Sequence, residues 1–108
     1  MIKRLTAWRA RPSIDPEQAL RYWRVEHASL VTRVPGVTRY VQNHRTTGPE
    51  EDPTSPQPYD GLGEVWFESV DAARTAVSTA EWRAVIEDAA TFMDFEHITA
   101  IWAEEHVI

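Results

Sequence analysis

Two ionisable side chains, His27 and Tyr40, occur where the surrounding pattern calls for hydrophobic residues. A histidine has an unperturbed pKa of about 6.5, which suits proton transfer near neutral pH. Burial would lower that pKa and keep the ring neutral, ready to accept a proton. A tyrosine hydroxyl can polarise a carbonyl group or stabilise an enolate. The structural alternative is a core histidine bonded to a backbone carbonyl and a strand tyrosine packed beneath a helix.

The helix expected to carry His27 spans residues 15–33. Asp15 can cap its N-terminus, Pro16 suits the first helical position, and Gln18 completes a capping box. One face of this helix is formed by residues at helical spacing: Leu20, Trp23, His27, Leu30, Val31 and Val34. The Pro-Gly pair that follows ends the helix. His27 therefore belongs to the buried stripe.

The other elements complete a β-α-β-β-α-β order. Strands are expected over residues 2–9, 37–45, 60–67 and 96–108, and two helical stretches begin after Ser69 and Thr79. This order is the split βαβ, or ferredoxin-like, pattern of the α+β class. We expect one domain over residues 1–108, with a four-stranded antiparallel sheet in the order 4-1-3-2 and both helices on one face.

Apolar residues on both faces of the third and fourth strands predict a partner for the helix-free side of the sheet. In the third strand, Leu62 and Trp66 share one face, and Val65 and Phe67 share the other. Helices can cover only one of these faces. We therefore expect a homodimer in which two sheets face each other.

Composition excludes several classes of function. The formal net charge of -6 argues against binding to nucleic acid or to an anionic membrane surface. The chain has no cysteine, and its four histidines follow no metal-binding spacing, so neither a thiol nucleophile nor a metal site is expected. Phosphate-loop and nucleotide-binding motifs are absent, and no cofactor is expected. No apolar run suggests a signal peptide or a membrane span, so a cytoplasmic location is expected.

Residues 46–59, TTGPEEDPTSPQPY, are rich in proline and acidic residues and lack periodicity. Such a composition disfavours regular structure. We expect a mobile loop, which could serve as a lid.

Several motifs, in order and at matching spacings, resemble the EthD family, named for ethyl tert-butyl ether degradation. They are Tyr22-Trp23-Arg24, Glu26-His27-Ala28, Pro35-Gly36, Arg39 to His44, Tyr59-Asp60-Gly61, Glu64 to Phe67, and the tail Glu104 to Ile108. The resemblance covers nearly the whole chain, and it implies the dimeric α/β-barrel form of the ferredoxin-like fold.

The resemblance also implies a pocket between sheet and helices for a small, oxygenated, mostly apolar ring. Relatives include methylmuconolactone methylisomerases, aromatic polyketide cyclases and accessory proteins of ether degradation, and the wider superfamily includes cofactor-free monooxygenases. His27 and Tyr40 match a histidine and a tyrosine in the pocket of the isomerases. The isomerases have a further histidine before the third strand, and residues 46–59 contain none.

Three hypotheses follow. The first is a cofactor-independent isomerase, cyclase or oxidoreductase that cyclises, isomerises, dehydrates or oxygenates such a ring, with His27 and Tyr40 as its catalytic residues. The second is a non-catalytic binding or accessory protein for a small apolar metabolite, and the third is a dimeric interaction module with a filled core. The residues expected to contact a ligand are Trp8, Trp23, Gln42, Trp66 and Phe92. Aromatic residues in such a pattern are more often core than pocket wall, so core packing is the alternative for the four aromatic residues. A pocket with polar groups separates the first two hypotheses from the third, and turnover separates the first from the second.

Overall fold

The computed structural model describes all 108 residues. Its elements in chain order are β1 (Ile2–Trp8), α1 (Pro16–Tyr22), η1 (Trp23–His27), α2 (Ala28–Val31), β2 (Arg39–His44), β3 (Gly61–Phe67), α3 (Val70–Ala76), α4 (Ala80–Ala89), η2 (Phe95–His97) and β4 (Thr99–Glu104). Here η1 is a π-helical turn and η2 a 3-10 turn. The predicted order of strands and helices is confirmed.

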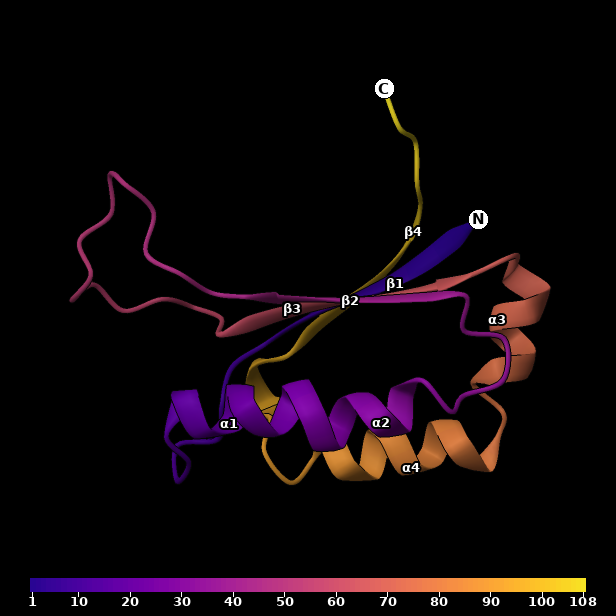
Figure 1. Cartoon of the computed structure of the whole chain (residues 1–108), viewed down its shortest axis with the longest axis horizontal. Helices are drawn as coiled ribbons and strands as arrows, with labels where there is room; N and C mark the ends of the chain where they lie inside the picture. The colour runs from indigo at the N-terminus through magenta and orange to yellow at the C-terminus, as the bar shows by residue number, and fades with distance from the viewer.

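The four strands form one antiparallel sheet in the order β2-β3-β1-β4, as predicted. Figure 1 shows the continuous helical segment of α1 and α2 lying beside α4 on one face of this sheet, with no helix on the opposite face. The fold is therefore ferredoxin-like and of two layers. None of its helices has the length and apolar character needed to cross a membrane.

The first helical segment runs without a break through α1, η1 and α2, from Pro16 to Val31. The side chain of Asp15 accepts a hydrogen bond from the backbone N–H of Glu17, so the predicted N-cap is confirmed. The expected capping box is not formed, because no hydrogen bond joins Gln18 to the cap. Gly36, with φ at +93°, then turns the chain toward β2.

Two hydrophobic clusters fill the space between the layers. The first joins Val31 and Val34 to Val65, Phe67, Ala73, Ala76 and Val85. The second consists of Trp8, Ala19, Trp23, Ala89, Phe92 and Met93. The helical stripe predicted from the sequence is thus divided between both clusters.

Two strands, β4 and β2, differ from the sequence-based expectation by more than one residue at an end. The strand predicted over residues 96–108 begins only at Thr99, because Asp94 accepts a hydrogen bond from the backbone of Glu96 and caps the η2 turn. It ends at Glu104, which pairs with Ile2, the first residue of β1, so the sheet offers no further partner beyond it. The second strand begins two residues later than predicted because the turn that ends the helix continues into Val37.

Residues 46–59 form neither helix nor strand, as predicted. Figure 1 shows this segment extending away from the sheet. Its side-chain hydrogen bonds are mostly internal, such as those from Gly48 and Gln57 to Glu51. At its base, the hydroxyl of Tyr59 lies 2.8 Å from Oγ1 of Thr99. The mobility of the loop stays a prediction.

Candidate functional site

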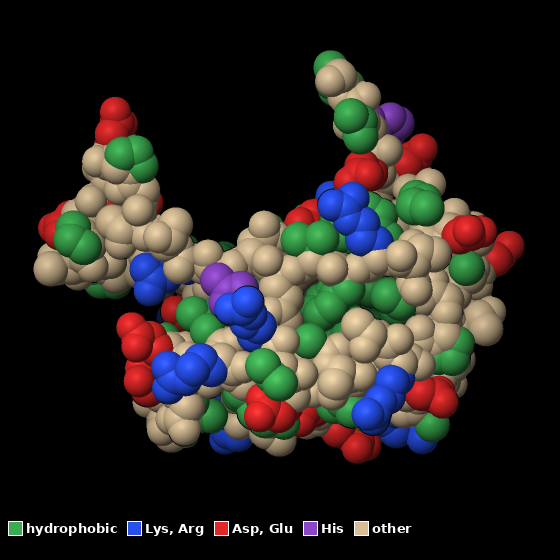
Figure 2. Space-filling view, viewed as in Figure 1, with side chains coloured by type: hydrophobic (Ala, Val, Ile, Leu, Met, Phe, Trp, Pro, Cys, Tyr) green, Lys and Arg blue, Asp and Glu red, His purple; other side chains and the backbone are tan.

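A cavity of about 240 Å³ lies between the sheet and the helices, and 12 of its 16 lining residues are hydrophobic. Figure 2 shows hydrophobic side chains in the recess between the sheet and the helical layer. Polar side chains come from Arg4, Thr6 and His27, and Tyr40, counted among the hydrophobic residues, adds its hydroxyl group. Such a combination of an apolar wall and a few convergent polar groups is typical of small-molecule sites.

The floor of the cavity is formed by rows of residues that are paired across β2, β3 and β1. On the helix-facing side the rows are Tyr40–Val65–Arg4, Gln42–Gly63–Thr6 and His44–Gly61–Trp8. The two glycines make room for tryptophan rings, because a Cβ at Gly61 would lie 2.7 Å from Nε1 of Trp8 and 2.8 Å from Cζ3 of Trp23. The alternate glycines of β3 therefore admit close approach of these rings, as their spacing indicates.

His27 is only 3% exposed and lies at the end of the π-helical turn. Its Nδ1 is 2.8 Å from Oδ2 of Asp88 on α4. The other carboxylate oxygen of Asp88 accepts a hydrogen bond from the hydroxyl of Tyr22, and this bond raises the pKa of Tyr22. Asp88 thereby joins α4 to both halves of the first helical segment, and it fixes the orientation of the imidazole.

The histidine ring favours its neutral form. Burial lowers the pKa of His27, and the hydrogen bond to Asp88 opposes this effect only in part. Because a carboxylate can only accept, Nδ1 carries the hydrogen and Nε2 carries the lone pair. Nε2 makes no hydrogen bond within the protein. His27 can therefore act as a general base toward a molecule in the cavity.

Tyr40 points into the same cavity from β2. Burial raises the pKa of Tyr40 to about 12, so the phenol stays protonated at neutral pH. The amide nitrogen of Gln42 donates to the Tyr40 oxygen at 2.8 Å and to the backbone carbonyl of Trp23 at 2.7 Å. The oxygen of Tyr40 thus accepts from Gln42, and its own hydrogen is left to donate to a ligand.

Trp23 to His27 form a π-helical turn inside an otherwise α-helical segment. Single π-turns are rare and frequently mark functional sites. Gln42 bonds to the carbonyl of Trp23, the first residue of the turn, and so ties it to the strand that carries Tyr40. The hydrophobic periodicity of the sequence did not predict this π-helical turn.

The predicted site residues lie in three places: in the cavity lining, next to that lining, and on the opposite face of the sheet. Trp8 and Trp23 line the cavity together with His27 and Tyr40, and no hydrogen bond joins the latter two directly. Gln42 does not line the cavity but bonds to two residues that do, Tyr40 and Trp23, and Phe92 packs against His27 with ring centroids 5.2 Å apart. Trp66 lies on the opposite face of the sheet, between the side chains of Lys3 and Arg39, so it does not line this cavity.

Sequence analysis did not predict two polar residues of the site, Asp88 and Arg4. Asp88 lies within the last turns of α4 beside the buried residues Val85 and Ala89, and an acidic residue next to an apolar stripe was the available signal. Arg4 shares the cavity side of β1 with Thr6, and strand alternation alone would have grouped the two. Which face they occupy follows only from the helices packed above.

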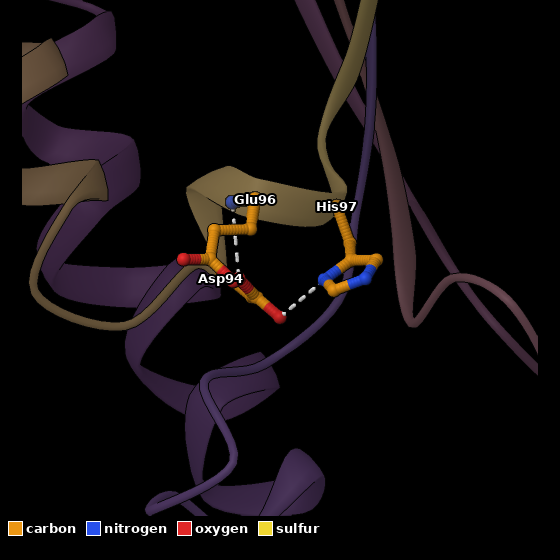
Figure 3. Close-up of side chains that lie close together, drawn as sticks. All are labelled: Asp94, Glu96 and His97. Carbon is orange, nitrogen blue, oxygen red and sulfur yellow. Dashed lines mark hydrogen bonds and ion pairs between the residues drawn. The ribbon is translucent and has the colours of Figure 1, made fainter.

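A second group of polar side chains lies at η2, away from the cavity lining. Asp94, Glu96 and His97 place ligand-type atoms within 4.8 Å of one another (Figure 3). Asp94 is already engaged, because it caps the turn through Glu96 N–H, pairs with His97 at 2.9 Å and contacts Nε of Arg9 at 3.4 Å. These contacts give the group a structural role in shaping the η2 turn.

Comparison with known proteins identifies relatives of the whole chain. The sequence matches the EthD domain family over residues 11–96, and no curated protein matches it. An EthD family protein from Bacillus halodurans C-125 superposes with a TM-score of 0.76 at 21% identity, covering 98% of this chain and 100% of that chain. A dimeric protein of ferredoxin-like fold from Bacteroides fragilis NCTC 9343 gives 0.66 at 13% identity, covering 96% and 95%. SnoaB, a cofactor-independent oxygenase from Streptomyces nogalater, gives 0.69 at 10% identity, covering 99% and 94%. At these identities the structural likeness establishes the fold and leaves the chemistry open.

Proposed function

Since this chain belongs to the EthD family, we propose that it carries out a cofactor-independent acid/base reaction on a small, oxygenated, mostly apolar ring compound bound in the cavity. The observation that carries the proposal is the pairing of His27 with Asp88 at the wall of an apolar cavity. A histidine with one nitrogen held by a carboxylate and the other free is the arrangement of a general base.

In the proposed mechanism, Nε2 of His27 removes a proton from a carbon next to a carbonyl group of the ligand. Asp88 stabilises the imidazolium that forms. The hydroxyl of Tyr40 donates a hydrogen bond to the carbonyl oxygen, where negative charge develops. Return of the proton to another atom gives an isomer. Attack of the enolate carbon on a second carbonyl group forms a carbon–carbon bond and closes a ring, and the resulting alkoxide takes the proton from the imidazolium. Expulsion of a β-hydroxyl group, which takes that proton and leaves as water, gives a dehydrated product. In an oxygenation, the enolate carbon would bond to dioxygen, which takes up the electron pair of the enolate and the proton of the imidazolium to give a hydroperoxide.

Proton exchange with solvent tests the mechanism without knowledge of the natural substrate. We suggest 2-tetralone as the probe, with incorporation of deuterium next to its carbonyl followed by NMR in D₂O. The wild-type protein should accelerate exchange, and His27→Gln should reduce the rate by about a hundredfold, a typical contribution of a general base. His97→Gln is the matched control, because His97 also pairs with an aspartate but lies outside the cavity lining. Equal rates for wild type and His27→Gln would contradict the assignment.

The second candidate is a binding or accessory protein that holds an apolar metabolite without changing it. The hydrophobic character of 12 of the 16 lining residues favours such a role. Titration of tryptophan fluorescence by 2-tetralone separates the two candidates, since Trp8, Trp23 and Trp82 line the cavity. Binding with no acceleration of exchange would favour the binding protein. The cavity itself argues against an interaction module with a filled core.

We also propose that the protein forms a homodimer through the helix-free face of the sheet. Ile101 is 54% exposed on that face, in register with Leu5 of β1. The dimeric state described for the Bacteroides fragilis protein of the same fold supports a dimer, and the exposed Ile101 favours the helix-free face as its interface. Light scattering on a sizing column should give a dimer at micromolar concentration, shifted to monomer by Ile101→Lys but not by Val25→Lys on the helical layer. A wild-type monomer would contradict the proposal.

A further inference from the structure

We propose that the ligand of this cavity is a small ring carboxylate and that Arg4 binds its carboxylate group. The inference rests on the proposed function, since both place the ligand beside His27, and it adds the charge and the orientation of that ligand. It comes from an arginine that reaches the cavity without an acidic partner.

Arg4 lies on β1 with its side chain in the cavity lining. Its guanidinium group stacks against the ring of Trp82, 5.4 Å from the ring centroid, and Nη1 donates one hydrogen bond of 2.7 Å to Oγ1 of Thr6. A guanidinium group has five N–H donors, and Thr6 is the only hydrogen-bonding partner. No carboxylate of the chain forms an ion pair with it.

Other arginines without an ion pair, such as Arg21 and Arg83, are exposed to solvent, whereas Arg4 is partly buried in the cavity lining. The neighbouring cation on β1 differs from Arg4 in this respect. Lys3 points to the opposite face and pairs with two carboxylates, Glu64 at 2.8 Å and Glu105 at 3.1 Å. The chain carries 17 acidic residues against 11 basic ones, so carboxylates are plentiful. Even so, none is placed beside Arg4, although burial lowers the pKa of that group and makes its charge costly. An anionic ligand would supply the missing partner.

The strand register indicates how such a ligand would be oriented. Arg4 and Tyr40 both pair with Val65 from opposite sides, so they stand in one row on the cavity floor. Two strand spacings separate their backbones by roughly 10 Å. A ring with a carboxylate at Arg4 and a carbonyl or hydroxyl oxygen at Tyr40 would span Val65 and present its carbon atoms to His27 in the helical layer.

The size of the cavity limits the ligand to one or two rings. Its volume of about 240 Å³ lies below the range of roughly 300–1,000 Å³ that is usual for drug-sized ligands. Arginine also suits a carboxylate better than lysine does, because two parallel N–H groups can bind both oxygens. The structure thus favours an aromatic or alicyclic acid with a second oxygen substituent.

The test compares an acid with its neutral amide of the same shape. We suggest isothermal titration of 2-naphthoate and 2-naphthamide into wild type, Arg4→Met, Arg4→Lys and Arg39→Met. Arg39 is the matched control, because it also stacks on a tryptophan, Trp66, but on the other face of the sheet. Wild type and Arg39→Met should bind the acid at least about tenfold more tightly than the amide, in line with a charge-assisted pair. The preference should vanish in Arg4→Met and persist, though weaker, in Arg4→Lys.

Equal affinities of wild type for acid and amide, including no measurable binding of either at millimolar concentration, would overturn the proposal. Retention of the preference in Arg4→Met would do so as well. Thermal melts check that the variants fold, and Arg4→Met without ligand should melt no lower than wild type if its charge lacks a partner. A lower melting temperature together with an unchanged acid preference would indicate a structural arginine. These binding measurements need no turnover. The proposed role of Arg4 can therefore be rejected while the proposed acid/base function stands, and the reverse is also possible.

Discussion

The molecule contains two histidine–aspartate pairs of nearly equal length in different surroundings. His27 lies 2.8 Å from Asp88 and His97 lies 2.9 Å from Asp94. The side chain of His27 is 4% exposed and that of His97 is 50% exposed. His27 lines the largely apolar cavity between the sheet and the helices, where its remaining nitrogen can meet a ligand, whereas Asp94 and His97 line a more polar depression at the surface. The comparison teaches that the environment of a hydrogen bond, and not its length, determines whether it can serve catalysis.

Replacing the aspartate of each pair by asparagine should give the largest difference between the two pairs, and the difference should appear in the rate of deuterium exchange. Asp88→Asn should slow the deuterium exchange of 2-tetralone by about a hundredfold or more, because the amide no longer fixes the tautomer of His27 or stabilises its charged form. Asp94→Asn should leave the rate within about twofold of wild type, because the pair lies outside the cavity lining and the amide oxygen of asparagine can still accept the capping hydrogen bond from Glu96. A normal rate in Asp88→Asn would show that the pair is only structural.

Replacing each histidine by alanine should lower the stability of the protein more at the buried pair than at the exposed pair. His27→Ala should lower the free energy of unfolding by about 1–3 kcal/mol, the cost of losing a buried hydrogen bond, while the native circular dichroism spectrum is retained. His97→Ala should leave the midpoint of urea unfolding nearly unchanged, because its side chain is half exposed. Similar midpoints for both variants would contradict the difference in burial.

A smaller effect is expected in the pH dependence of stability, to which the buried His27 should contribute. Burial lowers the pKa of His27 in the folded state below its unfolded value of about 6.5. The unfolded chain then binds more protons in this window, so His27 stabilises the fold above about pH 6.5 and loses that contribution as the pH falls toward the folded pKa. His44 shares the direction, since burial and Arg24 lower its pKa too.

Urea midpoints measured between pH 5 and 8 should therefore fall toward acid in wild type, and the slope should be smaller in His27→Gln. If His27→Gln keeps the full slope, His27 does not account for the acid sensitivity.

Removal of the long loop should have the smallest effect. Residues 46–59 have mostly internal, exposed hydrogen bonds, comparable in setting to the His97 pair. Replacement of residues 47–57 by a short Gly-Ser linker should leave the melting temperature nearly unchanged, because the free energy of loop closure depends weakly on length. A fall of several degrees, measured by circular dichroism, would show that the loop packs on the body.

The sequence was sufficient to predict the order of elements and the burial of His27. Helical spacing placed His27 between Trp23 and Val31, and the structure has all three buried. Strand alternation showed which residues share a face, but not which face the helices cover, so Trp66 was grouped with the ligand contacts although it lies on the far side. The resemblance to the EthD family supplied the pairing of His27 with Tyr40 in one pocket.

The partners of the site residues required three-dimensional information. Asp88 is 61 positions from His27, and the contact depends on the packing of α4 against the π-helical turn. The link from Gln42 to the carbonyl of Trp23 likewise joins a strand to a helix. Hydrophobic patterning records burial, whereas such polar contacts depend on how the elements are docked.

The central claim is that His27 is neutral, with its hydrogen on Nδ1 and its lone pair on Nε2 open to the cavity. Long-range ¹H–¹⁵N correlation spectra of uniformly ¹⁵N-labelled protein at pH 7 report the protonation of each ring nitrogen directly, and His27→Gln identifies the signals. We predict a protonated Nδ1 and an unprotonated Nε2 in the wild-type protein, with this tautomer preference lost in Asp88→Asn. A hydrogen on Nε2, in either a neutral or a doubly protonated ring, would contradict the account.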